Sequence, residues 1–74
     1  MPKYNDQEIQ NRFGENLRRL RMAKGYSLQD LANLCDVDKS NIGKIENGRF
    51  NLQLTKIFEL AKGLDIEPKD LLDF

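Results

Sequence analysis

The chain contains no histidine, and Cys35 is its only cysteine. A His-dependent catalytic triad and a zinc site are therefore excluded by the inventory of side chains. A single cysteine cannot form an intrachain disulfide, which is the usage expected in a reducing compartment. The carboxylates near the carboxyl end have neither a nucleophile nor a metal-ligand spacing beside them. We therefore expect no enzyme, no metal and no cofactor.

Long hydrophobic runs are missing as well. No apolar stretch reaches the roughly 18 residues of a transmembrane helix, and no leader or lipidation signal is recognisable. We expect a soluble, cytoplasmic protein without a membrane partner.

An excess of charge of either sign is also absent, because 12 basic residues balance 12 acidic ones. Zero net charge by itself argues against a nucleic-acid-binding protein. The charges are unevenly distributed, however. Residues 12–24 and 39–49 are mainly basic, whereas residues 59–74 are mainly acidic. One face could therefore still attract a polyanion.

The length of 74 residues predicts a single domain, 1–74, with a thin core. No strand pattern or repeat is present, and the apolar spacing predicts an all-α domain of five helices. The first helix begins after Asn5, which forms a capping box with Glu8, and ends before Gly25. The fourth helix is indicated by a stripe of apolar side chains, namely Leu54, Ile57, Phe58 and Ala61. Leu60 and Leu64 widen this apolar face enough to make it the expected central helix.

The second and third helices are short and lie close together in the sequence. Ser27 and Asp30 form a capping box that opens the second helix, and Asp38 caps the third, which runs over residues 39–46. Two short helices joined by a few residues indicate a helix-turn-helix over about residues 27–47. In this motif the second helix enters the major groove of DNA.

The third helix has two unlike sides. At about 100° per residue, Ile42 and Ile45 lie together and predict the buried side. The opposite side carries small, polar and basic residues: Ser40, Gly43, Lys44 and Asn47. Such a side suits the major groove, although most polar helix faces are merely solvated.

The chain resembles the phage-repressor/Cro type of helix-turn-helix protein, often called the Xre family. The resemblance rests on FGENLRRLRMAKGYSLQDLA, VDKSNIGKIENG and LTKIFELAKGLDIEPKDLL, which lie within residues 13–72. It implies a compact five-helix, lambda-repressor-like domain that binds operator DNA as a dimer and regulates transcription. Restriction–modification controller proteins are similarly compact members of this family.

The resemblance also implies roles for individual residues. The positions expected to contact bases are Lys39, Ser40, Asn41 and Lys44. The positions expected to contact the DNA backbone are Ser27, Gln29, Asn47, Arg49 and, on the first helix, Arg18. The family often has glutamine at the position of Leu28, where it bonds a phosphate, so that contact is lost here or passes to Gln29. Asp36 stands where the family prefers glycine in the turn, and aspartate tolerates a left-handed backbone better than most residues.

Glu46 lies at the carboxyl end of a helix, where the helix dipole disfavours a negative charge. The glutamate should therefore require a cation. The family pairs it with an arginine of the first helix, which corresponds to Arg21, so we expect a structural Arg21–Glu46 bridge.

The carboxyl end offers a candidate dimer interface. A fifth helix opens at Pro68 and spans about residues 67–73, and so short a helix cannot bury all of its apolar side chains. We expect an interface formed by Ile66, Leu71, Leu72 and Phe74, although Leu71 or Leu72 could instead fold into the monomer core.

The leading hypothesis is a sequence-specific regulator that binds double-stranded DNA as a homodimer and blocks or contacts RNA polymerase. The alternative is a protein-binding module, resembling an antitoxin or adaptor, that keeps the fold without specific DNA binding. Zero net charge and Leu28 favour the alternative.

Overall fold

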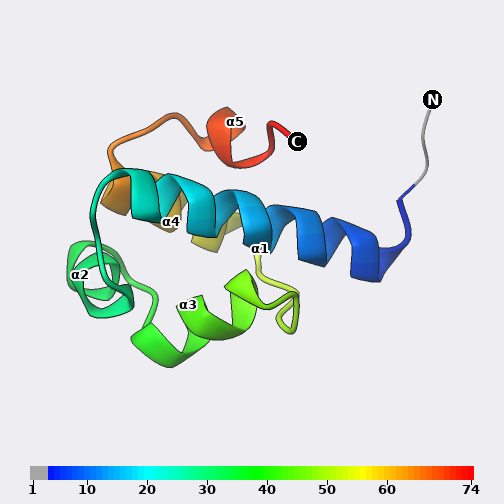
Figure 1. Ribbon diagram of the computed structural model, residues 1–74, viewed down its shortest axis with the longest axis horizontal. Helices are drawn as coiled ribbons and strands as arrows, with labels where there is room; N and C mark the ends of the chain where they lie inside the picture. Colours follow the sequence, from blue (N-terminus) through cyan, green and yellow to red (C-terminus); the bar gives the residue numbers. More distant parts are fainter. Residues whose placement is uncertain (1–3) are drawn as a thin grey trace.

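The computed structural model describes residues 4–74, so the first three residues of the predicted domain lie outside the described range. It contains five helices and, over those residues, no strand (Figure 1). The helices are α1 (Asp6–Ala23), α2 (Leu28–Leu34), α3 (Lys39–Glu46), α4 (Leu54–Leu64) and α5 (Pro68–Leu71). The predicted all-α class and the predicted number of helices are confirmed.

The helix ends follow from local hydrogen bonds between residues three apart. The Asn5 side chain accepts from the Glu8 amide, and the Asp38 side chain accepts from the Asn41 amide, each at 2.8 Å. Ser27 and Asp30 cap each other's backbone amides at the start of α2, as the capping box predicts. The helices α1, α2 and α3 therefore begin where their capping residues predict.

The long helix α1 runs across the molecule, with α3 on one side and α5 on the other (Figure 1). The helices α2 and α3 lie against each other at one end, and α4 packs on α2 and α5. The core between them contains fully buried side chains from all five helices: Leu17, Leu31, Ile42, Ile45, Leu60, Leu64 and Leu71. No helix among the described residues is long and apolar enough to cross a membrane.

The expected core stripe of α4 is partly wrong. Leu54 and Phe58 are 68% and 55% exposed. The side that packs inward carries Ile57 and Ala61 of that stripe, together with Leu60 and Leu64, which were expected to widen it. Both sets have the i, i+3, i+4, i+7 spacing of an amphipathic helix, so periodicity could not choose between them.

The expected dimer interface also needs a correction, because Leu71 is fully buried in the monomer core. A left-handed residue, Asp65 (φ 57°), ends α4 and lets the chain turn back so that α5 packs on α4 and α1. The single turn of α5 buries Leu71 and leaves Leu72 51% exposed. Ile66 is half-buried against the core.

Candidate nucleic-acid interface

The helix α3 is oriented by its two isoleucines. Ile42 and Ile45 are 0% and 1% exposed, so the helix presents its opposite side to solvent. Ser40 and Lys44 are exposed on that side, together with Asn47 at the helix end, and Lys39 is exposed at the helix start. The structure thus brings together most of the side chains that were predicted to contact bases.

Asn41 is separated from the other predicted base-contacting residues. It is half-buried and borders a hollow together with Val37, Ile45 and Phe50. Its backbone amide is used by the Asp38 cap. Asn41 therefore lies at the edge of the exposed side of α3 rather than at its centre.

The predicted bridge between Arg21 and Glu46 is present and bidentate. Arg21 Nε and Nη2 donate to Glu46 Oε2 and Oε1 at 2.6 and 2.9 Å, and Nη1 donates to the Tyr26 carbonyl at 2.7 Å. The two charged side chains are only 11% and 6% exposed. The hydrogen bonds with Glu46 raise the pKa of Arg21 above its ordinary value. The bridge joins α1 to the end of α3 and neutralises the only carboxylate of that helix.

Gly14 permits the close approach of α1 and α3. A Cβ atom at this position would collide with the Ile45 carbonyl oxygen and would lie 2.7 Å from the Glu46 carbonyl oxygen. Both are backbone atoms, so neither can move aside by changing a rotamer. Sequence reasoning missed this role, although an isolated glycine inside a helical pattern is a known signal of close packing.

The far end of α3 is held to the beginning of α1. Gly48 adopts a left-handed conformation (φ 71°) just after the helix, as glycine commonly does where a helix ends. The Gln7 side-chain amide donates to the Gly48 carbonyl at 2.8 Å and to Asn11 Oδ1 at 2.9 Å. With the bridge and Gly14, this contact fixes α3 against α1 along its carboxyl-terminal half.

The predicted backbone-contacting residues at the start of α2 are exposed. Ser27 Oγ accepts from the Asp30 amide at 3.0 Å, which leaves its hydroxyl proton free to be donated. Gln29 donates to Asn33 Oδ1 at 2.9 Å, an exposed contact that a phosphate oxygen could replace. Arg49 follows the end of α3 with an exposed side chain.

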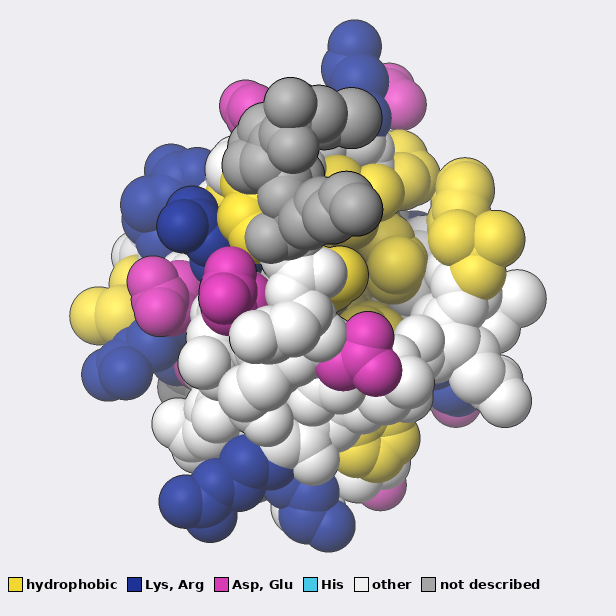
Figure 2. Space-filling view, turned by 90° about the vertical axis from the view of Figure 1, so that its right-hand side faces the viewer, with side chains coloured by type: hydrophobic (Ala, Val, Ile, Leu, Met, Phe, Trp, Pro, Cys, Tyr) yellow, Lys and Arg dark blue, Asp and Glu magenta, His cyan; other side chains and the backbone are white. Residues whose placement is uncertain are grey.

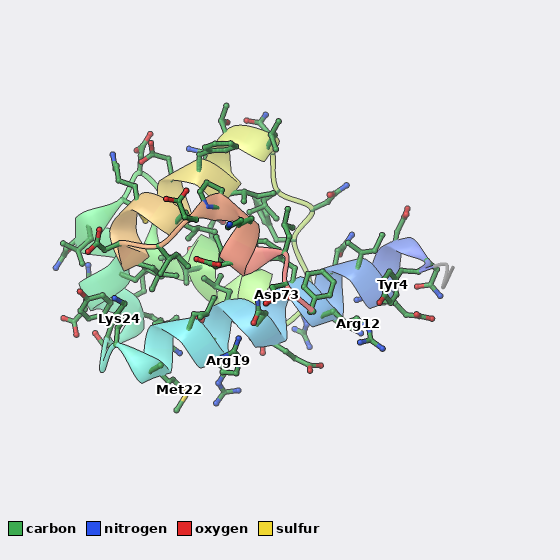
Figure 3. All side chains as sticks on the ribbon, turned by 90° about the horizontal axis from the view of Figure 1, so that it is seen from above. Tyr4, Arg12, Arg19, Met22, Lys24 and Asp73 are labelled. Carbon is green, nitrogen blue, oxygen red and sulfur yellow. The ribbon has the colours of Figure 1, made fainter. Side chains whose placement is uncertain are left out.

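The arginines of α1 lie on different sides of that helix. Gly14 marks the side of α1 that touches α3. At about 100° per residue around the helix axis, Arg18 lies about 40° from Gly14. Arg12 and Arg19 lie at about 160° and 140° on the same count, and they border a hollow with Asp73 at the chain end (Figure 3). Arg18 is therefore the one of these three that lies on the side of α3.

The turn between α2 and α3 does not use a left-handed residue at Asp36, since Asp65 is the only non-glycine residue with positive φ in the described range. The Asp36 amide donates to Glu59 Oε1 at 3.0 Å, and Lys56 Nζ donates to the Asp36 carbonyl at 2.9 Å. Side chains of α4 thus support the turn. The hydrogen bond from the Asp36 amide, followed by the contact of Lys62 Nζ with Glu59 Oε1 at 3.2 Å, lowers the pKa of Glu59.

The carboxyl end is attached to α1 through Asn16, a buried polar residue that sequence reasoning missed. Its side-chain amide donates to the carbonyls of Asp70 and Leu71 at 2.9 and 3.0 Å. Its oxygen accepts from Arg19 at 2.7 Å. No periodicity distinguishes a buried asparagine from an exposed one, so the sequence carries no signal for this contact.

The geometry of α2 and α3 is therefore that of a helix-turn-helix, and comparison with known proteins agrees. The family model described as Helix-turn-helix matches residues 17–71. The chain belongs to the helix-turn-helix family. Its resemblance to phage-repressor-type regulators, predicted from the sequence, is confirmed.

This helix-turn-helix protein is similar to several regulators. Control protein C.BamHI of Bacillus amyloliquefaciens is 41% identical over 63 residues, which cover 84% of this chain and 78% of that protein. The structure of the restriction-modification controller protein C.AhdI from Aeromonas hydrophila has a TM-score of 0.82 at 47% identity, covering 84% of this chain and 94% of that one. The competence pilus inhibition repressor of Acinetobacter baylyi is 33% identical over 76 residues, covering 84% of this chain and 69% of that protein.

Proposed function

We propose that this protein is a transcriptional regulator that binds double-stranded DNA sequence-specifically, with α3 in the major groove of an operator half-site. The observation that carries the proposal is the orientation of α3. Two buried isoleucines and the Arg21–Glu46 bridge hold it, while Ser40 and Lys44 are exposed on the opposite side and Lys39 at the helix start. The relatives described as regulators and controller proteins support the same function.

The electrostatics of this side favour a polyanion despite zero net charge. Glu46 is paired with Arg21 behind the helix, so its charge is neutralised there. Figure 2 shows basic side chains at the lower edge of the molecule, which is the edge formed by α3 in Figure 1. The acidic residues at the chain end lie with α5, on the other side of α1.

Within this proposal the side chains divide by chemistry. Lys39 and Lys44 can donate to guanine O6 and N7, and Ser40 can donate or accept, with Asn41 at the edge of the contact. The residues proposed to contact phosphates surround these positions: Ser27, Gln29, Asn47, Arg49 and Arg18. We propose that the protein acts in the cytoplasm by occupying the operator, where it blocks or contacts RNA polymerase.

Selection of bound sequences from random double-stranded DNA tests the proposal directly. We expect an enriched site whose binding weakens steeply with salt, since phosphate contacts release counterions. Lys44→Ala should reduce affinity for that site by about 1–3 kcal/mol and relax the preference at one base pair. Lys69→Ala, an exposed lysine of α5, is the matched control and should leave the base preference intact. Failure to enrich any site would favour the protein-binding alternative instead.

We further propose that the protein acts as a homodimer, since one domain of this size buries little DNA surface. Large hydrophobic side chains stay exposed on α4 and after α5, and some of them are visible in Figure 2. They are Leu54, Phe58, Leu72 and Phe74, with half-buried Ile66 nearby in sequence. Exposed apolar patches of this kind mark interaction surfaces.

Sedimentation of point variants tests the dimer. Phe58→Glu and Leu72→Glu should shift the protein towards monomer, because both side chains are more than half exposed and their loss spares the core. Met22→Glu, at a 59% exposed position on α1, is the control and should not change the sedimentation coefficient. If both test variants sediment like the wild type, the interface lies elsewhere.

A further inference from the structure

A hollow open to solvent lies between α2 and α3, beside the side chains proposed to contact bases. Its apolar part is formed by Leu28, Ala32 and Gly43, and its polar border by Gln29, Asp38, Lys39 and Ser40. These residues come from the two helices of the motif and from the Asp38 cap of α3. The hollow therefore belongs to the surface that faces DNA when α3 lies in the major groove.

The edges of the base pairs offer this hollow very few apolar groups. In the major groove, the bases present hydrogen-bond donors and acceptors, and the C5-methyl group of thymine is the one apolar group among them. We infer that the hollow formed by Leu28, Ala32 and Gly43 receives the C5-methyl group of a thymine in the operator. This inference rests on the proposed function and adds a specificity-determining contact to it.

Leu28 is the residue that makes the contact apolar. It is half-buried, packs against the core and leaves part of its side chain at the hollow. A polar side chain at the start of α2 could bond a phosphate, whereas leucine can only exclude water from an apolar neighbour. The position thus supplies base selectivity by shape and desolvation instead of a backbone contact.

Gly43 keeps the hollow open. A Cβ atom built there has Leu28 Cδ1 at 3.9 Å as its nearest neighbour, which is an ordinary van der Waals contact. The monomer could therefore hold alanine at this position without strain. Glycine inside a helix is less stable than alanine, so the packing of the monomer does not require it. The open space beside Leu28 is what this glycine provides.

Replacement of thymine by deoxyuridine tests the contact, because it removes the methyl group and leaves every hydrogen-bonding group in place. Each thymine of the selected operator is replaced in turn, and the affinity of the full-length chain is measured by gel shift. Burial of one methyl group predicts a loss of about fourfold at one thymine of each half-site. In Leu28→Ala, which enlarges the hollow, and in Gly43→Ala, which fills it, the same thymine replacement should reduce the affinity less than about twofold.

Two controls separate this result from general damage. Leu34→Ala makes the same substitution at an exposed leucine on the same helix, and it should retain the fourfold loss. Gly43→Ala should unfold at the same or a higher temperature than the wild type, so its effect cannot come from a destabilised fold.

The outcomes distinguish failure of the thymine contact from failure of the proposed function. If an operator is selected but no thymine couples to Leu28 and Gly43, the inference is overturned and the proposed function stands. The thymine assignment is equally overturned if only 5-methylcytosine, placed at cytosine positions, shows such coupling. If no operator is selected at all, the proposed function itself fails.

Discussion

Removal of the Arg21–Glu46 bridge is the sharpest test of how α3 is held. Arg21→Ala deletes two hydrogen bonds to Glu46 and one to the Tyr26 carbonyl. It leaves the Glu46 carboxylate, whose side chain is 6% exposed, without its cation at the end of a helix, where the dipole is also unfavourable.

The expected loss is large for so small a domain. Breaking a buried ion pair by removing one partner costs about 3–5 kcal/mol. A chain of 74 residues has a total free energy of unfolding of roughly 4–11 kcal/mol, at about 0.05–0.15 kcal/mol per residue. We therefore expect Arg21→Ala to lose between about a quarter and all of its free energy of unfolding.

Urea denaturation followed by circular dichroism measures this effect, with Arg18→Ala as the control at an exposed arginine on the same helix. Replacing both partners by apolar residues, Arg21→Met with Glu46→Leu, should recover much of the loss because no charge is then left buried alone. A change below about 1 kcal/mol for Arg21→Ala would refute the structural role, since that is the range of an exposed ion pair.

Three further perturbations follow from the packing. Gly14→Ala, which elsewhere in a helix would stabilise by about 1 kcal/mol, should lower the free energy of unfolding, because its Cβ meets the Ile45 and Glu46 backbone. Asn16→Ala should cost about 1–3 kcal/mol in urea denaturation, because it removes the donor to the buried Leu71 carbonyl and one donor to the part-buried Asp70 carbonyl. The pKa of Glu59 is lowered from its ordinary value of 4.5, so its ionised carboxylate stabilises the fold fully above about pH 4.5. This contribution is lost as the pH falls through the lowered pKa. Thermal unfolding of Glu59→Gln should therefore depend less on pH in this acidic range than that of the wild type.

The candidate site was largely predictable because its signals are local. Caps at Asn5, Ser27 and Asp38 each bond an amide three residues on, so their effect depends only on neighbouring sequence. The spacing of Ile42 and Ile45 likewise determined which side of α3 faces outward. Arg21 and Glu46 are 25 residues apart in the sequence. Their bridge was nevertheless expected, because a negative charge at a helix end requires a cation and the family resemblance indicates which one.

Other features were decided only when the helices packed. The sequence of α4 carries two apolar stripes of equal period, and contact with α2 and α5 selected the one that leaves Leu54 and Phe58 exposed. Leu71 entered the core because the left-handed Asp65 turns the chain and Asn16 holds its carbonyl against α1. Local sequence thus determined where α1, α2 and α3 begin and which side of α3 is polar. Tertiary structure alone determined which surplus apolar side chains remain exposed for a partner, because burial depends on the distant surfaces that each helix meets.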